Sequence, residues 1–211
     1  MRRSGRFAVL CTDIQGNLND PSFEIMLRQR LGGSFTVDAV VLDWDETRRR
    51  VLRATTEQGR DVGIRLGDAG LTRGLADGDV LGTVDDSFDG RPVVVAVRLR
   101  SAEVLQVEIP LDAPQALAQT AWEVGNMHAP LFHGDAVPDA LQLLTPDSGP
   151  LRRVLSGIPG VRVQSVRRTL EPSARFSTRI VDVLVRRAPD MKIVRKPALA
   201  TAHDANGDGK E

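Results

Sequence analysis

Histidine is the residue type in this chain whose chemistry stands out, because it occurs only at His128, His133 and His203. Imidazole is a suitable ligand for nickel, zinc and copper. His128 directly follows a predicted helix, and the C-terminal end of a helix carries a partial negative charge that favours a nearby cation. One histidine is a poor site alone, but a two-fold dimer repeats each residue near its axis and makes a pair. Two interpretations remain open: His128 is a metal ligand shared by two subunits, or a histidine that hydrogen-bonds the helix end.

The other two histidines are weaker candidates for the same metal. His133 precedes Gly134 and Asp135, and it could be an auxiliary ligand if the following strand folds back; otherwise it is an exposed turn histidine. His203 lies next to Asp204 in the polar C-terminal segment, from which it could reach a central metal.

Two further features of the sequence could bind a partner or a metal. The basic run Arg48, Arg49 and Arg50 could meet an acidic partner surface, or it could be a solvated strand end.

Cys11 could bind nickel or zinc as a thiolate, or it could be a lone buried thiol. Because Cys11 is the single cysteine, it cannot form a disulfide within the chain, which fits a reducing compartment. We therefore expect a cytoplasmic protein.

Composition argues against several classes of function. The formal net charge of zero gives no general attraction to nucleic acid or to an anionic membrane. Aromatic residues make up 4% of the chain and tyrosine is absent, so platforms for stacking bases are not expected. No apolar run approaches the ~20 residues that span a bilayer. The motifs of phosphate loops, dinucleotide sites and nucleophile elbows are missing. We expect no enzyme, no nucleic-acid partner and no membrane partner.

The pattern of apolar residues predicts an α+β chain with two domains. Residues 1–35 are a turn-rich, partly ordered leader in which residues 23–30 could form a short helix. Residues 36–100 hold several short strands separated by Gly and Asp turns, which predicts a small all-β domain. Strands are expected at residues 37–44, 51–56, 61–66, 80–81 and 91–99.

The periodicity changes after Pro110. A helix is predicted with Asp112 as its N-cap, an apolar stripe at Leu117, Ala121 and Val124, and its end at Gly125. A second helix is predicted from Ser148 to Ser156, and strands at residues 103–109, 129–132, 141–144 and 161–169. The resulting order β-α-β-β-α-β is the ferredoxin-like arrangement, which we assign to residues 101–188. A further strand is possible at residues 176–185, and residues 189–211 are expected to be a flexible tail.

The segment Gly125-Asn126-Met127-His128-Ala129-Pro130 resembles the Gly-Asn-Arg-His signature of the urease accessory protein UreE family. The resemblance extends over about residues 15–170. It includes the segments Gly16–Leu18, Val41–Trp44, Thr47–Arg50, Ala54–Gly63 and Leu75–Val80.

This resemblance implies a nickel metallochaperone that delivers Ni²⁺ to apo-urease, with urease and the other accessory proteins as partners. It also implies a homodimer in which the histidine of the signature, here His128, comes from both subunits and holds one nickel. Zn²⁺ or Cu²⁺ can compete for such a site. The chain departs from the family at Met127, which replaces arginine, and in its tail, which has His203 where many members are histidine-rich.

Two other interpretations come from different classes of function. A non-metal assembly module of the same fold would bind protein partners without using His128. An RNA-binding module of β-α-β-β-α-β topology would need exposed aromatic residues on two central strands, and Val104–Ile109 and Val161–Thr169 supply none.

Overall fold

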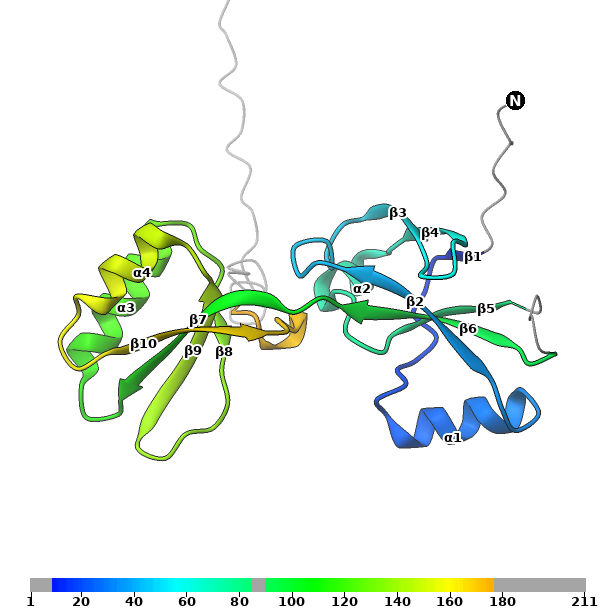
Figure 1. Ribbon diagram of the computed structural model, residues 1–211, viewed down its shortest axis with the longest axis horizontal. Coiled ribbons are helices and arrows are strands. Elements are labelled where there is room, and N and C mark those ends of the chain that lie inside the picture. Colours follow the sequence, from blue (N-terminus) through cyan, green and yellow to red (C-terminus); the bar gives the residue numbers. More distant parts are fainter. Residues whose placement is uncertain (1–8, 85–89, 177–211) are drawn as a thin grey trace, which may run out of the picture. The chain divides into compact units, whose positions relative to one another are not determined.

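The computed structural model describes residues 9–84 and 90–176, and within them the chain is a mixed α+β protein. Three small sheets and four helices are formed by these residues (Figure 1). The elements of the first half are β1 (Val9–Cys11), α1 (Pro21–Arg30), β2 (Thr36–Leu42), β3 (Val51–Thr55), β4 (Asp61–Arg65), α2 (Asp68–Arg73), β5 (Val80–Val84) and β6 (Val93–Leu99). Those of the second half are β7 (Ala102–Pro110), α3 (Pro114–Asn126), β8 (Phe132–His133), β9 (Ala140–Pro146), α4 (Gly149–Ser156), β10 (Arg162–Arg168) and a 3-10 turn, η1 (Pro172–Ala174).

The first half contains two three-stranded sheets, with the strand orders β1-β4-β3 and β2-β6-β5. In each sheet one pair is parallel, β1 with β4 and β2 with β6, and the other is antiparallel. Alternating β-branched residues place one face of each strand in a shared aliphatic core. That core includes Val40, Leu42, Val62, Ile64, Leu81, Val95 and Val97.

The described part of the expected leader contributes to this packing. Strand β1 places Val9 and Cys11 in the core, and α1 buries Leu27 against Val80 and Val94. Helix α1 begins after Asp20, whose side chain accepts a hydrogen bond from the Ser22 N–H. The possible helix at residues 23–30 is therefore present and starts two residues earlier.

Helix α2 is an addition to the region expected to be all-β. Its six residues, Asp68–Arg73, lie between Gly67 and Gly74. So short a helix gives no apolar period in the sequence, and the three glycines in and around it indicate turns instead.

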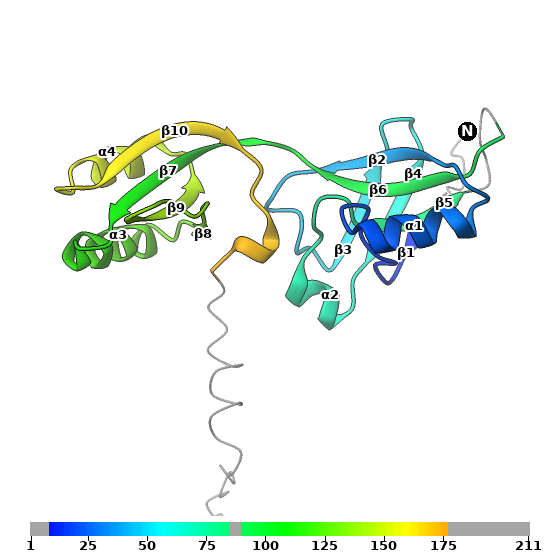
Figure 2. The same ribbon diagram turned by 90° about the horizontal axis from the view of Figure 1, so that it is seen from below.

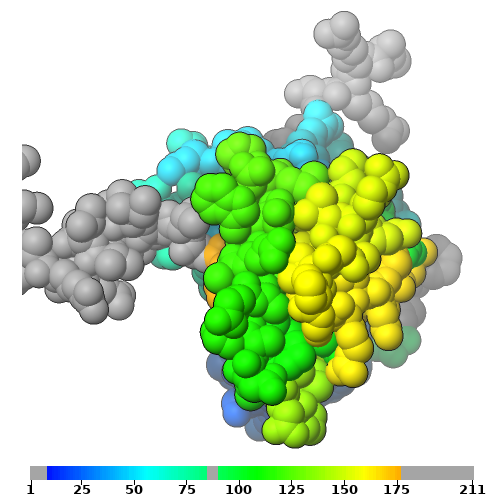
Figure 3. All heavy atoms as spheres, turned by 90° about the vertical axis from the view of Figure 1, so that its left-hand side faces the viewer, coloured from blue at the N-terminus to red at the C-terminus, as the bar shows by residue number. Residues whose placement is uncertain are grey.

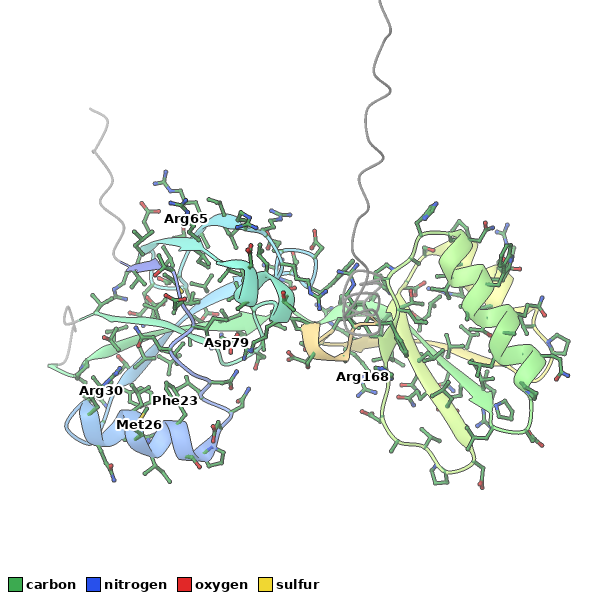
Figure 4. All side chains as sticks on the ribbon, turned by 180° about the vertical axis from the view of Figure 1, so that it is seen from behind. Phe23, Met26, Arg30, Arg65, Asp79 and Arg168 are labelled. Atoms are coloured by element: carbon green, nitrogen blue, oxygen red, sulfur yellow. The ribbon has the colours of Figure 1, made fainter. Side chains whose placement is uncertain are left out.

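A buried carboxylate, Asp79, joins several segments of the first half. Its side chain is fully buried and accepts hydrogen bonds from both terminal nitrogens of Arg73, at 2.5 and 2.8 Å. The backbone N–H of Ala76 donates to it at 2.7 Å, and the Asn17 amide at 2.9 Å. Figure 4 labels Asp79 among the side chains of this half. The turn at Asn17, the end of α2 and the start of β5 are thus held by one negative charge.

The second half is one antiparallel sheet with strand order β10-β7-β9-β8, and α3 and α4 pack on one of its faces (Figures 1 and 2). Leu105, Val107 and Ile109 of β7 point to the helices, where they contact Leu151 and Leu155. The helix predicted from Ser148 to Ser156 is present as α4, and Ser148 is its N-cap, since its hydroxyl accepts a hydrogen bond from the Leu151 N–H.

Two predictions about α3 are wrong. The N-cap is Ala113, which makes no side-chain capping bond, so Asp112 does not cap the helix. Val124 of the predicted stripe is buried as expected, whereas Leu117 is 38% exposed and Ala121 is exposed, and Ala116 and Thr120 are buried in their place. Ala116 and Thr120 each lie one position before the predicted residue, about 100° around the helix, and packing on the sheet selected the row that contains the threonine.

Replacing Arg73 by methionine should destabilise the protein by about 3 kcal/mol, because the buried charge of Asp79 then loses its counter-ion. Urea denaturation would measure this free energy of unfolding. The matched control is Arg50→Met: its ion pair with Asp68 is exposed on both sides, at 61% and 90%, and should contribute less than about 1 kcal/mol. Equal effects of the two substitutions would contradict the role given to Asp79.

Candidate metal site at the end of helix α3

His128 lies just beyond α3 in a left-handed backbone conformation, with φ of +53°. Its N–H donates to the Gly125 carbonyl at 3.0 Å, and the Ala129 N–H donates to the Val124 carbonyl at 3.1 Å. These two bonds form a Schellman helix ending, in which the left-handed position is usually occupied by glycine. The backbone therefore satisfies the helix end, and the imidazole is not needed there.

A side chain in the left-handed region costs roughly 1–2 kcal/mol. Strained positions of this kind tend to gather at functional sites, so the presence of histidine at this position points to a use for its side chain. His128 is exposed, and within residues 9–84 and 90–176 its imidazole makes no hydrogen bond or ion pair. The ring is therefore available to an external ligand.

A depression of about 400 Å³ adjoins this imidazole. It is lined by Ala121, Trp122, Gly125, Asn126 and His128. Trp122 is 70% exposed, an unusual state for so large an apolar side chain. The depression belongs to the outer side of the helix layer, which faces the viewer in Figure 3.

The outer face of α3 is uncharged, largely apolar and rich in small residues. The exposed apolar residues of the helix are Pro114, Leu117, Ala118, Ala121, Trp122 and Gly125, and the exposed polar ones are Gln115, Gln119 and Asn126. Glu123 is the one charged residue of the whole helix. A solvated helix face normally carries charged residues, so an uncharged face with an exposed tryptophan indicates a protein interface.

One chain does not provide a complete metal site in its described part. Residues 9–84 and 90–176 hold no group of three or more His, Cys, Asp or Glu side chains placed to bind one ion. A site at His128 would therefore need ligands from a second molecule or of another type.

The two other histidines are placed differently. His133 lies on β8 with its ring against that of Phe176, at 3.8 Å between centroids. This contact covers one face of the imidazole, and the ring itself is exposed. His203 lies outside the described residues.

The basic run Arg48–Arg50 is largely matched by nearby groups. Arg49 pairs with Asp45 and Glu46, and Arg50 pairs with Asp68. A terminal nitrogen of Arg48 donates to the Pro172 carbonyl at 3.0 Å. The run as a partner-binding surface stays a prediction.

Cys11 is a buried thiol on β1 and is 2% exposed. Burial, together with the negative charge of Asp13, raises the pKa of its thiol to about 11. Its Sγ donates to the Asp13 carbonyl at 3.3 Å. A thiol that stays protonated inside the core is unsuited to metal binding, which favours the structural interpretation of Cys11.

The described helices contain no stretch long and apolar enough to cross a membrane.

Comparison with known proteins gives one family. Residues 12–98 match the family model described as UreE urease accessory protein, N-terminal domain. The protein named urease accessory protein UreE of Helicobacter pylori (strain G27) is 31% identical over 166 residues, which cover 77% of this chain and 90% of the relative. The protein of that name in Helicobacter acinonychis (strain Sheeba) is 30% identical over 183 residues, 81% of this chain and 100% of the relative. That of Halalkalibacterium halodurans is 37% identical over 97 residues, 45% of this chain and 56% of the relative.

These similarities place the chain among the accessory proteins of urease rather than among enzymes. The chain belongs to the UreE urease accessory protein family.

Substituting His128 by glycine should stabilise the metal-free protein by about 1 kcal/mol, because glycine adopts a φ of +53° without strain. Asp139, which has a φ of +57°, provides a control away from the site. Its change to glycine should stabilise the protein similarly without affecting metal binding. A loss of stability in His128→Gly, measured by urea denaturation, would show that the imidazole itself holds the helix end.

Stability should also depend on pH above pH 9 through Cys11. The folded protein holds its thiol proton up to a pKa of about 11, against 9.0 for an ordinary thiol, so the unfolded state loses the proton first. The contribution is complete below about pH 9 and is lost as the pH rises towards 11. Tyrosine is absent and lysine occurs only at Lys192, Lys196 and Lys210, so few other groups titrate in this window.

Denaturation curves at several pH values, for the wild type and for Cys11→Ala, test this prediction. Below about pH 9, Cys11→Ala should be less stable than the wild type, and this difference should shrink between pH 9 and 11 because the variant lacks the thiol whose titration lowers the stability of the wild type. Parallel declines in the two proteins would contradict it.

Proposed function

We propose that this protein is a dimeric nickel metallochaperone that delivers Ni²⁺ to apo-urease during assembly of the enzyme's active site. The observation that carries the proposal is the exposed, strained His128 at the end of a helix whose outer face is uncharged and apolar. Membership of the family indicates a role in urease assembly, and His128 is the residue proposed to bind the nickel.

The proposed dimer brings two copies of α3 together. The small residues Ala118, Ala121 and Gly125 allow close approach of a second helix, while Leu117 and Trp122 offer apolar area to bury. An isologous contact repeats each residue across a two-fold axis. Because His128 lies at the end of the same face, its two copies would come from both subunits to one ion.

Nickel suits this donor set. Imidazole is a borderline ligand that binds Ni²⁺, Zn²⁺ and Cu²⁺, and the order of divalent affinities means that Cu²⁺ or Zn²⁺ can compete. Two imidazoles leave several coordination positions open. Ni²⁺, the cargo, can then pass to a partner by ligand exchange, with no bond made or broken in the protein.

The two halves of the chain would have different functions. Residues 36–100 would form the partner-binding domain, which contacts urease and the other accessory proteins, with Arg48, Arg49 and Arg50 as weak candidates for that contact. Residues 101–188 would form a ferredoxin-like domain for dimerisation and metal binding. The strand order β10-β7-β9-β8 and the element order β-α-β-β-α-β support the ferredoxin-like assignment. The site of action would be the cytoplasm, where a lone cysteine stays reduced.

His133 and His203 are proposed as auxiliary ligands only. His133 would bind through a ring nitrogen in the plane of its imidazole, while Phe176 stays against the face of the ring. The competing function is an assembly module of the same fold that binds proteins and not nickel.

Calorimetric titration with Ni²⁺, with the mass in solution measured alongside, tests the proposal. The wild-type dimer should bind one Ni²⁺, and His128→Ala should lose or greatly weaken this binding while it remains a dimer. Asp139→Gly, a change away from the site, is the control and should bind like the wild type, whereas His133→Ala should weaken binding far less than His128→Ala. Equal binding by wild type and His128→Ala would reject the site, and no binding by either would favour the assembly module.

A further inference from the structure

Two imidazoles do not complete the coordination of Ni²⁺, and the depression beside His128 contains one more side chain that can donate an electron pair. Of its other lining residues, Ala121 and Gly125 have no donor atom in a side chain. The indole of Trp122 carries an N–H and no free lone pair for a metal. The amide oxygen of Asn126 remains.

Asn126 is placed to serve this purpose. It is the last residue of α3, two positions before His128, and its side chain is exposed in the same depression. Within the described residues its amide makes no hydrogen bond, although asparagine near a helix end commonly finds one. The amide oxygen is therefore available at the same surface as the imidazole.

We propose that the Asn126 amide oxygen is the second ligand that each subunit contributes to the nickel site. This proposal rests on the proposed function, since it requires the paired His128 residues. Two imidazole nitrogens and two amide oxygens make a set of nitrogen and oxygen donors, which suits Ni²⁺ and Cu²⁺.

A neutral amide oxygen also suits a carrier. A carboxylate would add charge and hold the ion more tightly, and water alone would not fix its geometry. The exposed indole of Trp122 lines the same depression and can shield the ligands from water when a second copy covers it. The ion would thus be held firmly enough to carry and weakly enough to release.

Calorimetric titration of the full-length dimer with NiCl₂ tests the assignment with three variants. Asn126→Ala removes the donor, and Asn126→Asp replaces the amide oxygen by a charged oxygen in the same position. Gln119→Ala is the matched control, because Gln119 is an exposed amide on the same helix outside the depression. The thermal unfolding midpoint of each metal-free variant and its mass in solution are recorded alongside.

Asn126→Ala should weaken nickel binding by about tenfold or more and keep one Ni²⁺ per dimer. Asn126→Asp should bind at least as tightly as the wild type, and Gln119→Ala should not differ from it. Wild-type affinity in Asn126→Ala would overturn the assignment, and so would equal weakening in the alanine and aspartate variants, because a structural role affects both. Dissociation of the Asn126→Ala dimer would overturn it as well. In each case, loss of binding in His128→Ala would leave the proposed function intact.

Discussion

The buried charge of Asp79 is the constraint on which the first half of the chain depends. A carboxylate without water must be paired and hydrogen-bonded, because the cost of burying it alone exceeds what one domain can offset. Arg73 and the Ala76 N–H meet that requirement from the residues just before Asp79, and Asn17 does so from 62 residues away. Gly78, with a φ of +80°, lies so close to the Asn17 amide that a Cβ would come within 2.8 Å of it. The turns on both sides of Asp79 are therefore determined together.

A similar pair joins the two sheets of this half. Asp38 on β2 is buried and accepts hydrogen bonds from Arg60 at 2.6 Å and from the Gln58 N–H at 3.1 Å, both in the β3–β4 hairpin. The aliphatic core supplies most of the apolar burial, while these two carboxylates select one arrangement of the strands. A first half held together in this way would lose little ordering entropy if it docked on another protein.

Helix α3 of the second half has two roles with opposite effects on stability: it packs on the sheet, and it carries the exposed face that ends at His128. Its inner face packs on the sheet through Ala116, Thr120 and Val124. Its outer face remains uncharged and its end holds His128 in a strained conformation, which lowers the stability of the isolated chain. Natural sequences break such local rules mainly where function requires it. The stability lost at this helix end is small beside the apolar burial of the core formed by β7, β9 and α4.

The sequence by itself determined most strands, the helix that starts at Ser148, the β-α-β-β-α-β order and the candidate histidine, because periodicity and residue scarcity are local properties. It could not determine which row of α3 is buried, since Ala116 and Leu117 are neighbours and only packing on the sheet chooses between them. The left-handed backbone of His128 comes from two hydrogen bonds of the helix end, and histidine is not a residue type that predicts this conformation. In the sequence, Asp79 is an ordinary turn residue beside Gly78. Its burial becomes evident only in the structure, where Asn17 and Arg73 both contact it. Short α2 has no period to detect. The buried row of α3 and the burial of Asp79 depend on contacts with segments distant in the sequence, so the tertiary structure decided them. The His128 conformation and α2 are local, but α2 is too short to show a period and His128 is not the glycine that usually marks such a helix end.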